Sequence, residues 1–471
     1  MRITLVLAGA AAFALVWSVP PADSVHSPFV SAHSLGHSPS AVTIYDANPE
    51  HLWNRLHATL FVRDDLPETQ HLIDVLDPPL WYHTSYLLSK PSHRPVLAVL
   101  DEFLQMHGEN LIHDPVKRAI LQRDLWAVFD WAEERQPNDE SGSAYAKERR
   151  ELRIRLAEAL RRIALSPEEL AALPDNYAQA VASGEFGQEY DPIHRERVFL
   201  PPDLFEARGP WVELEDPGRP EPVAFQHVLN FSARSSFLVF LRLPGGRKAA
   251  FDYLQALWDF PGPWVIVPAG GGFRKVMNPN VPQFPAGTEV ALVRQLTLFD
   301  NRGALVHSPI IESVQIRVYR EIRNRDEWPR DTEEAIALSG QDFYDIELNR
   351  ARCFAGKAGG LRALQPDEKD FTRFNGPGPD EGRPYAKLRT YAPILKQCTF
   401  CHQGQGIHSL NSRANLIKPH ALQKDRLAEA SDPHWWQDAR TLAMKRRLGN
   451  WTALMELWKE SGGVSVPGER R

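Results

Sequence analysis

The feature that most constrains this chain is a short stretch towards its C-terminal end, Cys398-Thr399-Phe400-Cys401-His402. It has the form C-x-x-C-H, so its two thiols are about one helical turn apart and a histidine follows directly. The chain has only three cysteines, which leaves Cys353 as the third. A framework of disulfide bonds is therefore excluded. Hydrophobic residues make up 43% of the chain, which is enough for sizeable packed cores.

This spacing is the one at which haem is attached covalently to a protein chain. The two thiols can reach the two vinyl groups of one porphyrin, and His402 then lies under the iron as the proximal ligand. The stretch resembles the haem-attachment site of the c-type cytochromes, and the resemblance is confined to the C-terminal part of the chain. It implies one covalently bound haem c and a small, mostly helical cytochrome c-like region.

Three other interpretations of the same residues stay open. Zinc could be held by Cys398, Cys401 and either His402 or His408, although the chain has no second C-x-x-C pair. A thioredoxin-like redox pair would need a surrounding βαβ pattern, which is not visible in the sequence. A disulfide between the two cysteines would close a very short ring. Haem attachment fits best because an export signal also precedes the motif.

The sixth coordination position of the iron separates two functions. In many c-type cytochromes a methionine downstream of the motif fills it, so Met444 is the first candidate, His408 the second and an open site the third. Methionine ligation suits electron transfer, whereas an open site permits ligand binding or peroxide chemistry. Other candidates are His420 and His434 as iron ligands, and Arg413 and Lys418 as partners of the haem propionates.

The N-terminus predicts export. Residues 1–22 hold one positive charge and an apolar run over 3–19, which is typical of a secretory signal. Pro20 makes a poor cleavage site, so an uncleaved membrane tether is the alternative. Residues 23–44 are expected to form a flexible linker. The remainder of the chain is therefore expected in the periplasm or at the outer face of the cytoplasmic membrane.

The charge balance bears on the choice of partners. The formal net charge is −6 and no basic patch stands out, so nucleic-acid binding has no electrostatic support. If the iron transfers electrons, we expect a redox partner protein, which the sequence does not identify.

Residues 45–185 predict a helical domain. Asp114-Pro115 has the form of an N-cap followed by proline at the first helical position. A second helix is expected over about 144–164, with i,i+4 charge pairs on one face. These pairs are Glu151/Arg155 and Glu158/Arg162. Ser166 and Glu169 have the spacing of a capping box, which predicts a further helix start.

Residues 195–325 predict a β-rich domain. Apolar runs at 237–241 and 264–267 are typical of strands buried on both faces, and the three glycines at 270–272 indicate a loop. Further strands are expected over 290–299 and 314–322, with a turn between them. The pattern indicates an antiparallel sandwich or barrel. It contains no catalytic motif.

Residues 330–465 hold the predicted monohaem region. Helix and loop are expected over 331–375, where Cys353 is expected to be a small buried apolar residue. A run of glycine and proline at 376–384 indicates a boundary. The C-terminal helix is expected from Trp435 to Lys459, with a possible break at Gly449.

These patterns together predict an α+β multidomain chain that is exported and carries one haem c. The expected function is one-electron transfer by that haem. An open-site, peroxidase-like haem enzyme and a zinc-stapled binding protein are the alternatives. No catalytic residue is assigned, and the sequence does not decide whether the chain is an enzyme.

Overall fold

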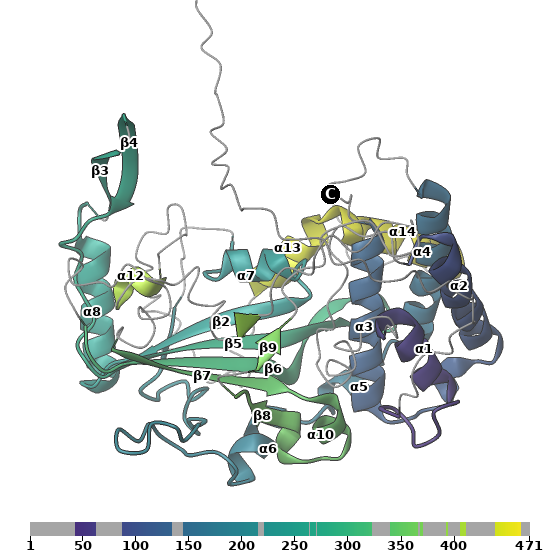
Figure 1. Ribbon diagram of the computed structural model, residues 1–471, viewed down its shortest axis with the longest axis horizontal. Helices are drawn as coiled ribbons and strands as arrows, with labels where there is room; N and C mark the ends of the chain where they lie inside the picture. The colour runs from purple at the N-terminus through teal and green to yellow at the C-terminus, as the bar shows by residue number, and fades with distance from the viewer. Residues whose placement is uncertain are drawn as a thin grey trace, which may run out of the picture. The chain divides into compact units, whose positions relative to one another are not determined.

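The computed structural model describes residues 43–62, 87–133, 145–214, 221–262, 264–269, 271–322, 340–365, 368–370, 392–393, 406–410 and 439–462. Residues 39–471 group into one compact unit. Helices and an antiparallel sheet occur together in the described part, so the predicted α+β class is confirmed (Figure 1). The predicted signal or anchor at residues 1–22 lies outside the described residues, as does almost all of the linker.

The first half of the described chain is helical. Its elements are α1 (Leu52–Phe61), α2 (Lys90–Gln105), η2 (Gly108–Asn110), α3 (Pro115–Glu133), α4 (Ala146–Ile163), α5 (Pro167–Ala171) and α6 (Asn176–Ala182). Helix α3 begins at the predicted proline, and the Asp114 carboxylate accepts hydrogen bonds from the backbone N–H groups of Val116 and Lys117. Helix α5 begins with the predicted capping box, because both reciprocal bonds between Ser166 and Glu169 are present.

One of the two charge pairs predicted on α4 is present in the structure, and the other is not. Arg162 contacts Glu158 at 2.6 Å, as expected. Arg155 instead forms a two-bond pair with Asp101 of α2, at 2.7 and 3.0 Å. Spacing along a helix predicts which side chains can meet, but a carboxylate on the neighbouring helix offered Arg155 a better bidentate geometry.

One sheet of six antiparallel strands forms the centre of the fold, in the order β1-β2-β5-β6-β7-β8. The strands are β1 (Val212–Glu213), β2 (Ser235–Arg242), β5 (Thr288–Phe299), β6 (Leu305–Tyr319), β7 (Gln341–Leu348) and β8 (Leu361–Ala363). The prediction of a sandwich or barrel is therefore wrong for the described residues. Helices, rather than a second sheet, contribute apolar side chains to both faces.

The last two strands of this sheet were not predicted, since residues 331–375 were expected to contain only helix and loop. Strand β7 pairs with β6 over seven residue pairs, and β8 pairs with β7. The central sheet thus continues into the segment assigned to the haem region. Helix α10 (Arg350–Phe354) and η4 (Ala358–Gly360) connect the two strands.

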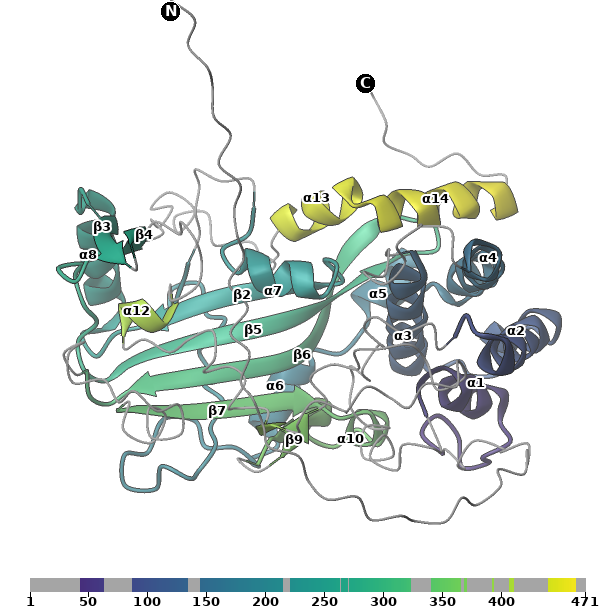
Figure 2. The ribbon, with the colours of Figure 1, turned by 45° about the horizontal axis from the view of Figure 1, so that its top comes forward.

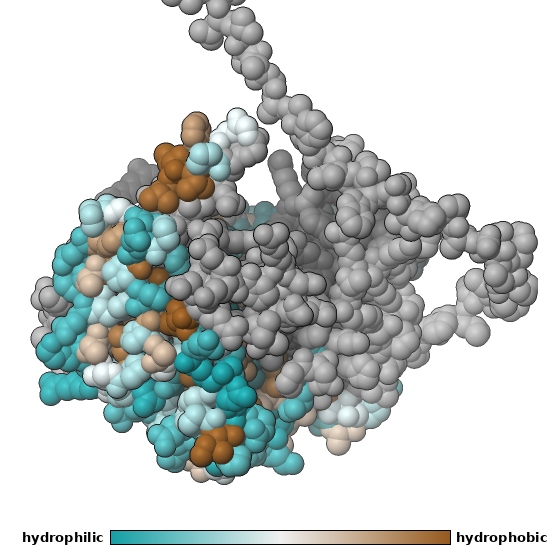
Figure 3. Space-filling model, turned by 60° about the vertical axis from the view of Figure 1, so that its left-hand side comes forward, coloured by the Kyte–Doolittle hydropathy of each residue, from teal (hydrophilic) through white to brown (hydrophobic). Residues whose placement is uncertain are grey.

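A separate two-stranded hairpin consists of β3 (Trp264–Ala269) and β4 (Gly272–Met277). The prediction of a strand at 264–267 is confirmed, but its burial is wrong, because Ile266 is 71% exposed. Phe273 on the facing strand is 80% exposed. Figure 3 shows hydrophobic side chains gathered at the top of this side of the molecule.

The remaining elements are α7 (Phe225–Asn230), α8 (Gly246–Asp259), β9 (Lys369–Asp370), β10 (Ala392–Pro393), α12 (Ile407–Leu410), α13 (Ala439–Arg447) and α14 (Gly449–Gly462). The predicted C-terminal helix is present, and it is broken next to Gly449, where α14 begins.

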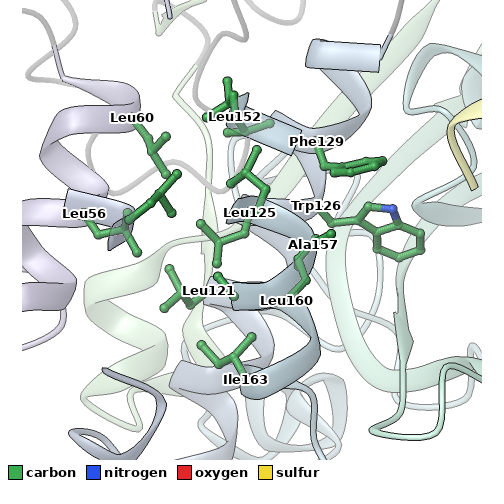
Figure 4. Packing of buried hydrophobic residues seen from close by; sticks show 14 of the residues in the cluster. Leu56, Leu60, Leu121, Leu125, Trp126, Phe129, Leu152, Ala157, Leu160 and Ile163 are labelled. Carbon is green, nitrogen blue, oxygen red and sulfur yellow. The ribbon is translucent and has the colours of Figure 1, made fainter. Parts of the chain in front are cut away.

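Three apolar cores hold these elements together. The helical core joins α1 to α4 with α14, and Figure 4 shows how leucines of α3 and α4 interlock within it. The other two cores lie on opposite faces of the sheet. One includes side chains of α6, and the other includes side chains of α7, α8, α12 and α13 (Figure 2). Segments from all three predicted regions therefore share cores.

Candidate functional site

The haem-attachment residues predicted from the sequence, Cys398, Cys401 and His402, lie outside the described residues. The same holds for His420, His434, Arg413 and Lys418. The first described residue after the motif is Gly406, which precedes α12. The surroundings of α12 are therefore the closest described structure on the C-terminal side of the motif along the chain.

Helix α12 is fixed to the sheet by two specific contacts. The backbone N–H of Ile407 donates to the side-chain oxygen of Gln283 at 2.7 Å. The hydroxyls of Ser409 and Tyr319, at the end of β6, lie 2.5 Å apart. Gly406 adopts a φ of 53°, and a Cβ added there would meet Gln283 at 2.0 Å. Only glycine allows the chain to approach this closely.

The face of the sheet that carries Tyr319 also holds a group of mostly polar side chains, of which Arg317, Tyr319 and Asp345 are buried. Side chains on a strand alternate between faces, so Gln315 and Arg317 of β6 share this face with Tyr319. Their direct cross-strand partners on β7 are Asp345 and Phe343. We call this group the polar sheet patch and define it by Gln315, Arg317, Tyr319, Phe343 and Asp345.

Arg317 is buried in the patch with an unsatisfied donor. Its exposed fraction is 7%, and its guanidinium lies over the Phe343 ring at 4.5 Å from the centroid. Within the described part of the chain, its Nη1 has no hydrogen-bond partner. Burial raises the pKa of the neighbouring Tyr319 hydroxyl, and the charge of Arg317 opposes that rise.

Asp345 is the acidic member of the patch. It is 1% exposed, and its Oδ2 accepts a hydrogen bond from Gln315 at 3.0 Å. Its Oδ1 has no hydrogen-bond partner among the residues described. Burial raises the pKa of Asp345 to about 7, although Arg317 lowers it. The carboxyl is thus partly protonated at neutral pH and neutralises the arginine only in part.

Further positive charge lies on the same face of the sheet. Arg294 contacts Glu312 at 3.1 Å, and its guanidinium stacks over the Phe231 ring at 3.6 Å from the centroid. Glu312 also pairs with Arg123, so one carboxylate serves two guanidinium groups. Burial lowers the pKa of His227 on α7 to about 4, helped by the charges of Arg317 and Arg294. This field favours an anion and keeps the imidazole neutral.

Two predicted candidates for the sixth iron position are described. Met444 on α13 is 5% exposed and belongs to the same apolar core as Ile407. It therefore packs as a core residue, and its role as an iron ligand stays a prediction. His408 lies in α12 and is half-buried.

Cys353 behaves as predicted for a packing residue. It is partly buried at the edge of the core on the α6 side of the sheet. Burial raises the pKa of its thiol to about 12, so the reactive thiolate does not form at neutral pH.

Sequence reasoning did not find the polar sheet patch. In the strand expected over 314–322, Gln315, Arg317 and Tyr319 alternate with apolar residues, which is typical of a half-buried strand, but Arg317 and Tyr319 are buried. The alternation along β6 was the available signal, yet alternation does not say what covers the second face.

The described residues contain neither a cluster of metal-binding side chains nor a helix that could span a membrane. No group of three or more His, Cys, Asp or Glu side chains is arranged there to hold a metal ion. No helix within the described ranges is long and apolar enough to cross a membrane. Comparisons with protein-family models, curated proteins and solved structures found no match for this chain.

Proposed function

We propose that this protein is an exported haem c protein that transfers one electron at a time. Cys398 and Cys401 would form the two covalent bonds to the porphyrin, and His402 would be the proximal iron ligand. The observation that carries this proposal is the C-x-x-C-H stretch. Neither Cys353 nor the histidines scattered along the chain form a motif that could attach a haem.

The described residues near this stretch fit a haem group. Gly406 lies four positions after His402, and a chain of that length spans at most about 14 Å. A porphyrin needs apolar and aromatic side chains against its rings and donors for its two carboxylates. The Phe284 and Tyr319 rings pack in a tilted arrangement with centroids 5.2 Å apart, and both residues belong to the core that holds Ile407. Arg317, on the same strand face as Tyr319, is buried, and its Nη1 has no hydrogen-bond partner among the described residues.

The protein would supply attachment, orientation and electrostatics. Haem contributes an iron that alternates between two oxidation states. The contacts of α12 with Gln283 and Tyr319 hold the first described segment that follows the motif along the chain. The excess positive charge on the sheet face favours the reduced state of a nearby redox centre, because reduction adds a negative charge.

We further infer that residues 330–465 include a small cytochrome c-like region and that residues 1–22 direct export to the periplasm or the outer face of the cytoplasmic membrane. Residues 1–22 would be removed or would remain as a tether. The large region before the motif exceeds what an electron carrier needs, so it suits docking of a redox partner or sensing.

The first test is a reduced-minus-oxidised absorption spectrum of the full chain, expressed with a haem-maturation system. We expect a sharp α band of the c type that survives denaturation and acid-acetone extraction, because the haem is covalently bound. Replacing Cys398 and Cys401 with serine should remove the resistant band. Cys353→Ser is the matched control, since it removes the third thiol at a partly buried position outside the motif, and it should keep the band.

The opposite result would overturn the proposal. A colourless protein that contains one equivalent of zinc would instead support a zinc-stapled binding protein. The same spectra separate the two haem functions. A low-spin ferric form that binds cyanide slowly supports electron transfer, whereas rapid cyanide binding and carbon monoxide uptake on reduction support an open, peroxidase-like site.

A pair of variants tests the sixth ligand. If Met444 binds the iron, Met444→Leu abolishes the sulfur-to-iron charge-transfer band and converts the haem to a form that binds carbon monoxide. His408→Ala should then leave the spectrum unchanged. If instead Met444→Leu keeps the wild-type spectrum, Met444 serves only the apolar core in which it is buried.

A further inference from the structure

The hairpin of β3 and β4 presents one apolar face to solvent. Ile266 is 71% exposed and Phe273 is 80% exposed, and Pro268, the register partner of Phe273, is also exposed. Alternate residues on a strand and directly opposed residues of an antiparallel pair lie on the same face, so these three residues share one face. We call them the hairpin face. Val265 and Val267 alternate with them and are half-buried.

The base of the hairpin is fixed, although its strands do not join the central sheet. The side-chain amide of Asn278 donates to the carbonyl of Gly262 at 2.7 Å, which closes the base. The hydroxyl of Tyr253 on α8 donates to the carbonyl of Pro282 at 2.8 Å. Figures 1 and 2 show the hairpin next to α8. A two-stranded hairpin alone is only marginally stable, so a surface that covers the hairpin face would also stabilise the hairpin.

The charge of this segment has the opposite sign to that of the whole chain. Residues 260–287 contain Arg274 and Lys275 but no aspartate or glutamate, in a chain with 60 acidic residues and a formal net charge of −6. Both cations belong to β4: Arg274 directly follows Phe273, and Lys275 is the register partner of Ile266. Exposed apolar residues therefore occur in the same short hairpin as a local excess of positive charge, which favours an anionic partner.

The composition of the hairpin fits a lipid surface better than a protein surface. The three glycines at 270–272 give the turn no side chains for specific recognition of a protein partner. A bilayer surface requires only apolar area, which enters the boundary between headgroups and acyl chains, and cations, which pair with anionic headgroups. A second copy of the chain would instead bring the same cations close to one another.

We propose that the hairpin face docks on an anionic lipid surface. Ile266, Pro268 and Phe273 enter the interfacial region of the bilayer, while Arg274 and Lys275 pair with the negative charge of the headgroups. This contact is separate from residues 1–22, so it does not depend on whether those residues remain as a tether.

The test is amide hydrogen exchange of the full chain with and without lipid vesicles. Vesicles of equal parts phosphatidylglycerol and phosphatidylcholine should slow exchange in residues 264–277, and vesicles of phosphatidylcholine alone should leave it nearly unchanged. The measurement is local to the hairpin, so binding through another segment does not imitate it. Raising the salt concentration should weaken the protection, because salt screens the attraction between the cations and the headgroups.

Two double variants separate the apolar contribution from the charged one. Ile266→Ser with Phe273→Ser should raise the lipid concentration for half-maximal protection at least tenfold, because it removes the inserted apolar area. Arg274→Gln with Lys275→Gln should raise it by about tenfold or more and remove the preference for phosphatidylglycerol, since each cation contributes roughly a factor of five. Ile193→Ser is the matched control: Ile193 is 82% exposed but lies outside the hairpin, and the variant should behave as the wild type.

Three outcomes would overturn the proposal. The first is exchange at 264–277 that neither kind of vesicle changes. The second is equal protection by neutral and anionic vesicles. The third is protection that rises with protein concentration in the absence of lipid, which would identify a second copy of the chain as the occupant. None of them involves the C-x-x-C-H stretch, so the proposed haem function would be unaffected.

Discussion

Buried charge is handled in two different ways in this protein, on helix α3 and on the polar sheet patch. On α3, Asp124 accepts two hydrogen bonds from Arg350, at 2.5 and 2.7 Å, and neither side chain is exposed. Asp130 of the same helix pairs with Lys445 at 2.7 Å and with Arg234 at 2.6 Å. Asp130 leaves its Oδ1 without a hydrogen-bond partner among the described residues, but two cations hold its Oδ2. On the sheet, Arg317 and Asp345 are buried to a similar extent, and each also retains an atom without a hydrogen-bond partner among the described residues.

The difference separates buried charges that are held in ion pairs from buried charges that are not. Each pair on α3 joins residues far apart in the sequence, so it fixes the helix against the sheet and against α10 and α13. Removing one partner leaves an uncompensated charge in a site with low dielectric constant. On the sheet, by contrast, neither Arg317 nor Asp345 makes an ion pair with another described residue. We therefore expect mutations on α3 to affect folding and mutations in the patch to affect the pH dependence of stability.

The largest effect is expected from breaking the pair between Asp124 and Arg350. Arg350→Met should lower the free energy of unfolding by about 3 to 5 kcal/mol, because it leaves a buried carboxylate unpaired. Chemical denaturation of the full chain measures this. The matched control is Arg55→Met, which breaks the partly exposed pair with Glu102 and should cost about 0 to 1 kcal/mol.

A double-variant cycle sharpens this expectation. Asp124→Asn combined with Arg350→Met should lose less stability than the two single losses added together, since the charge and its partner disappear at once. Equal, purely additive losses would show that the pair contributes no coupling, and the contrast between α3 and the sheet patch would fail.

The next effect concerns the pH dependence of stability and arises from Asp345. Its pKa is about 7 in the folded chain and about 4 when unfolded. Between these values the folded state binds more protons than the unfolded state, so the stability that this group contributes is present below pH 4 and is lost as pH rises to 7.

Replacing Asp345 with asparagine should remove the loss of stability that this carboxyl causes as pH rises. We expect Asp345→Asn to exceed the wild type in stability by about 1 to 3 kcal/mol at pH 8 and by less at pH 5. Thermal unfolding at both pH values measures the difference. Asp252→Asn is the control, because Asp252 is exposed and pairs with Lys248 at the surface. A parallel shift at both pH values in Asp345→Asn would contradict the expected titration.

The smallest effect is expected at the contact between α12 and the sheet. Ser409→Ala removes the partner of the buried Tyr319 hydroxyl and should cost about 0.5 to 1.5 kcal/mol. Adding Tyr319→Phe removes the hydroxyl that has lost its Ser409 partner, so the double variant should regain part of the lost stability. If hydrogen exchange at Ile407 does not rise in Ser409→Ala, the hydroxyl contact does not hold α12 on the sheet.

Local signals made the helical half of the fold predictable. Asp114 before Pro115 and Ser166 before Glu169 satisfy backbone donors within the first helical turn, so nearby residues alone determine these starts. Arg155 could not be assigned in the same way, because its partner Asp101 belongs to another helix. Strand β7 carries a visible alternation of Tyr344, Ile346 and Leu348, but only its pairing with β6 makes it part of the sheet.

The candidate site also has one part that local sequence predicts and one part that depends on tertiary structure. The C-x-x-C-H stretch is local and was found directly in the sequence. The polar sheet patch depends on β6 and β7 lying side by side and on coverage of the face they share, and both are tertiary properties. A polar residue in an alternating strand is predicted to face solvent, and Arg317 is an exception that only the folded structure reveals.

The packing of α14 has a consequence for the order in which the chain can fold. Trp451, Leu454 and Trp458 lie in the core formed by α1 to α4, and Trp458 packs against Phe299 with ring centroids 5.6 Å apart. During synthesis the N-terminal helices emerge several hundred residues before the helix that completes their core. The residues Cys398 to His402 also emerge before α14. The haem attachment proposed for this motif would thus have an interval in which the helical core is still incomplete.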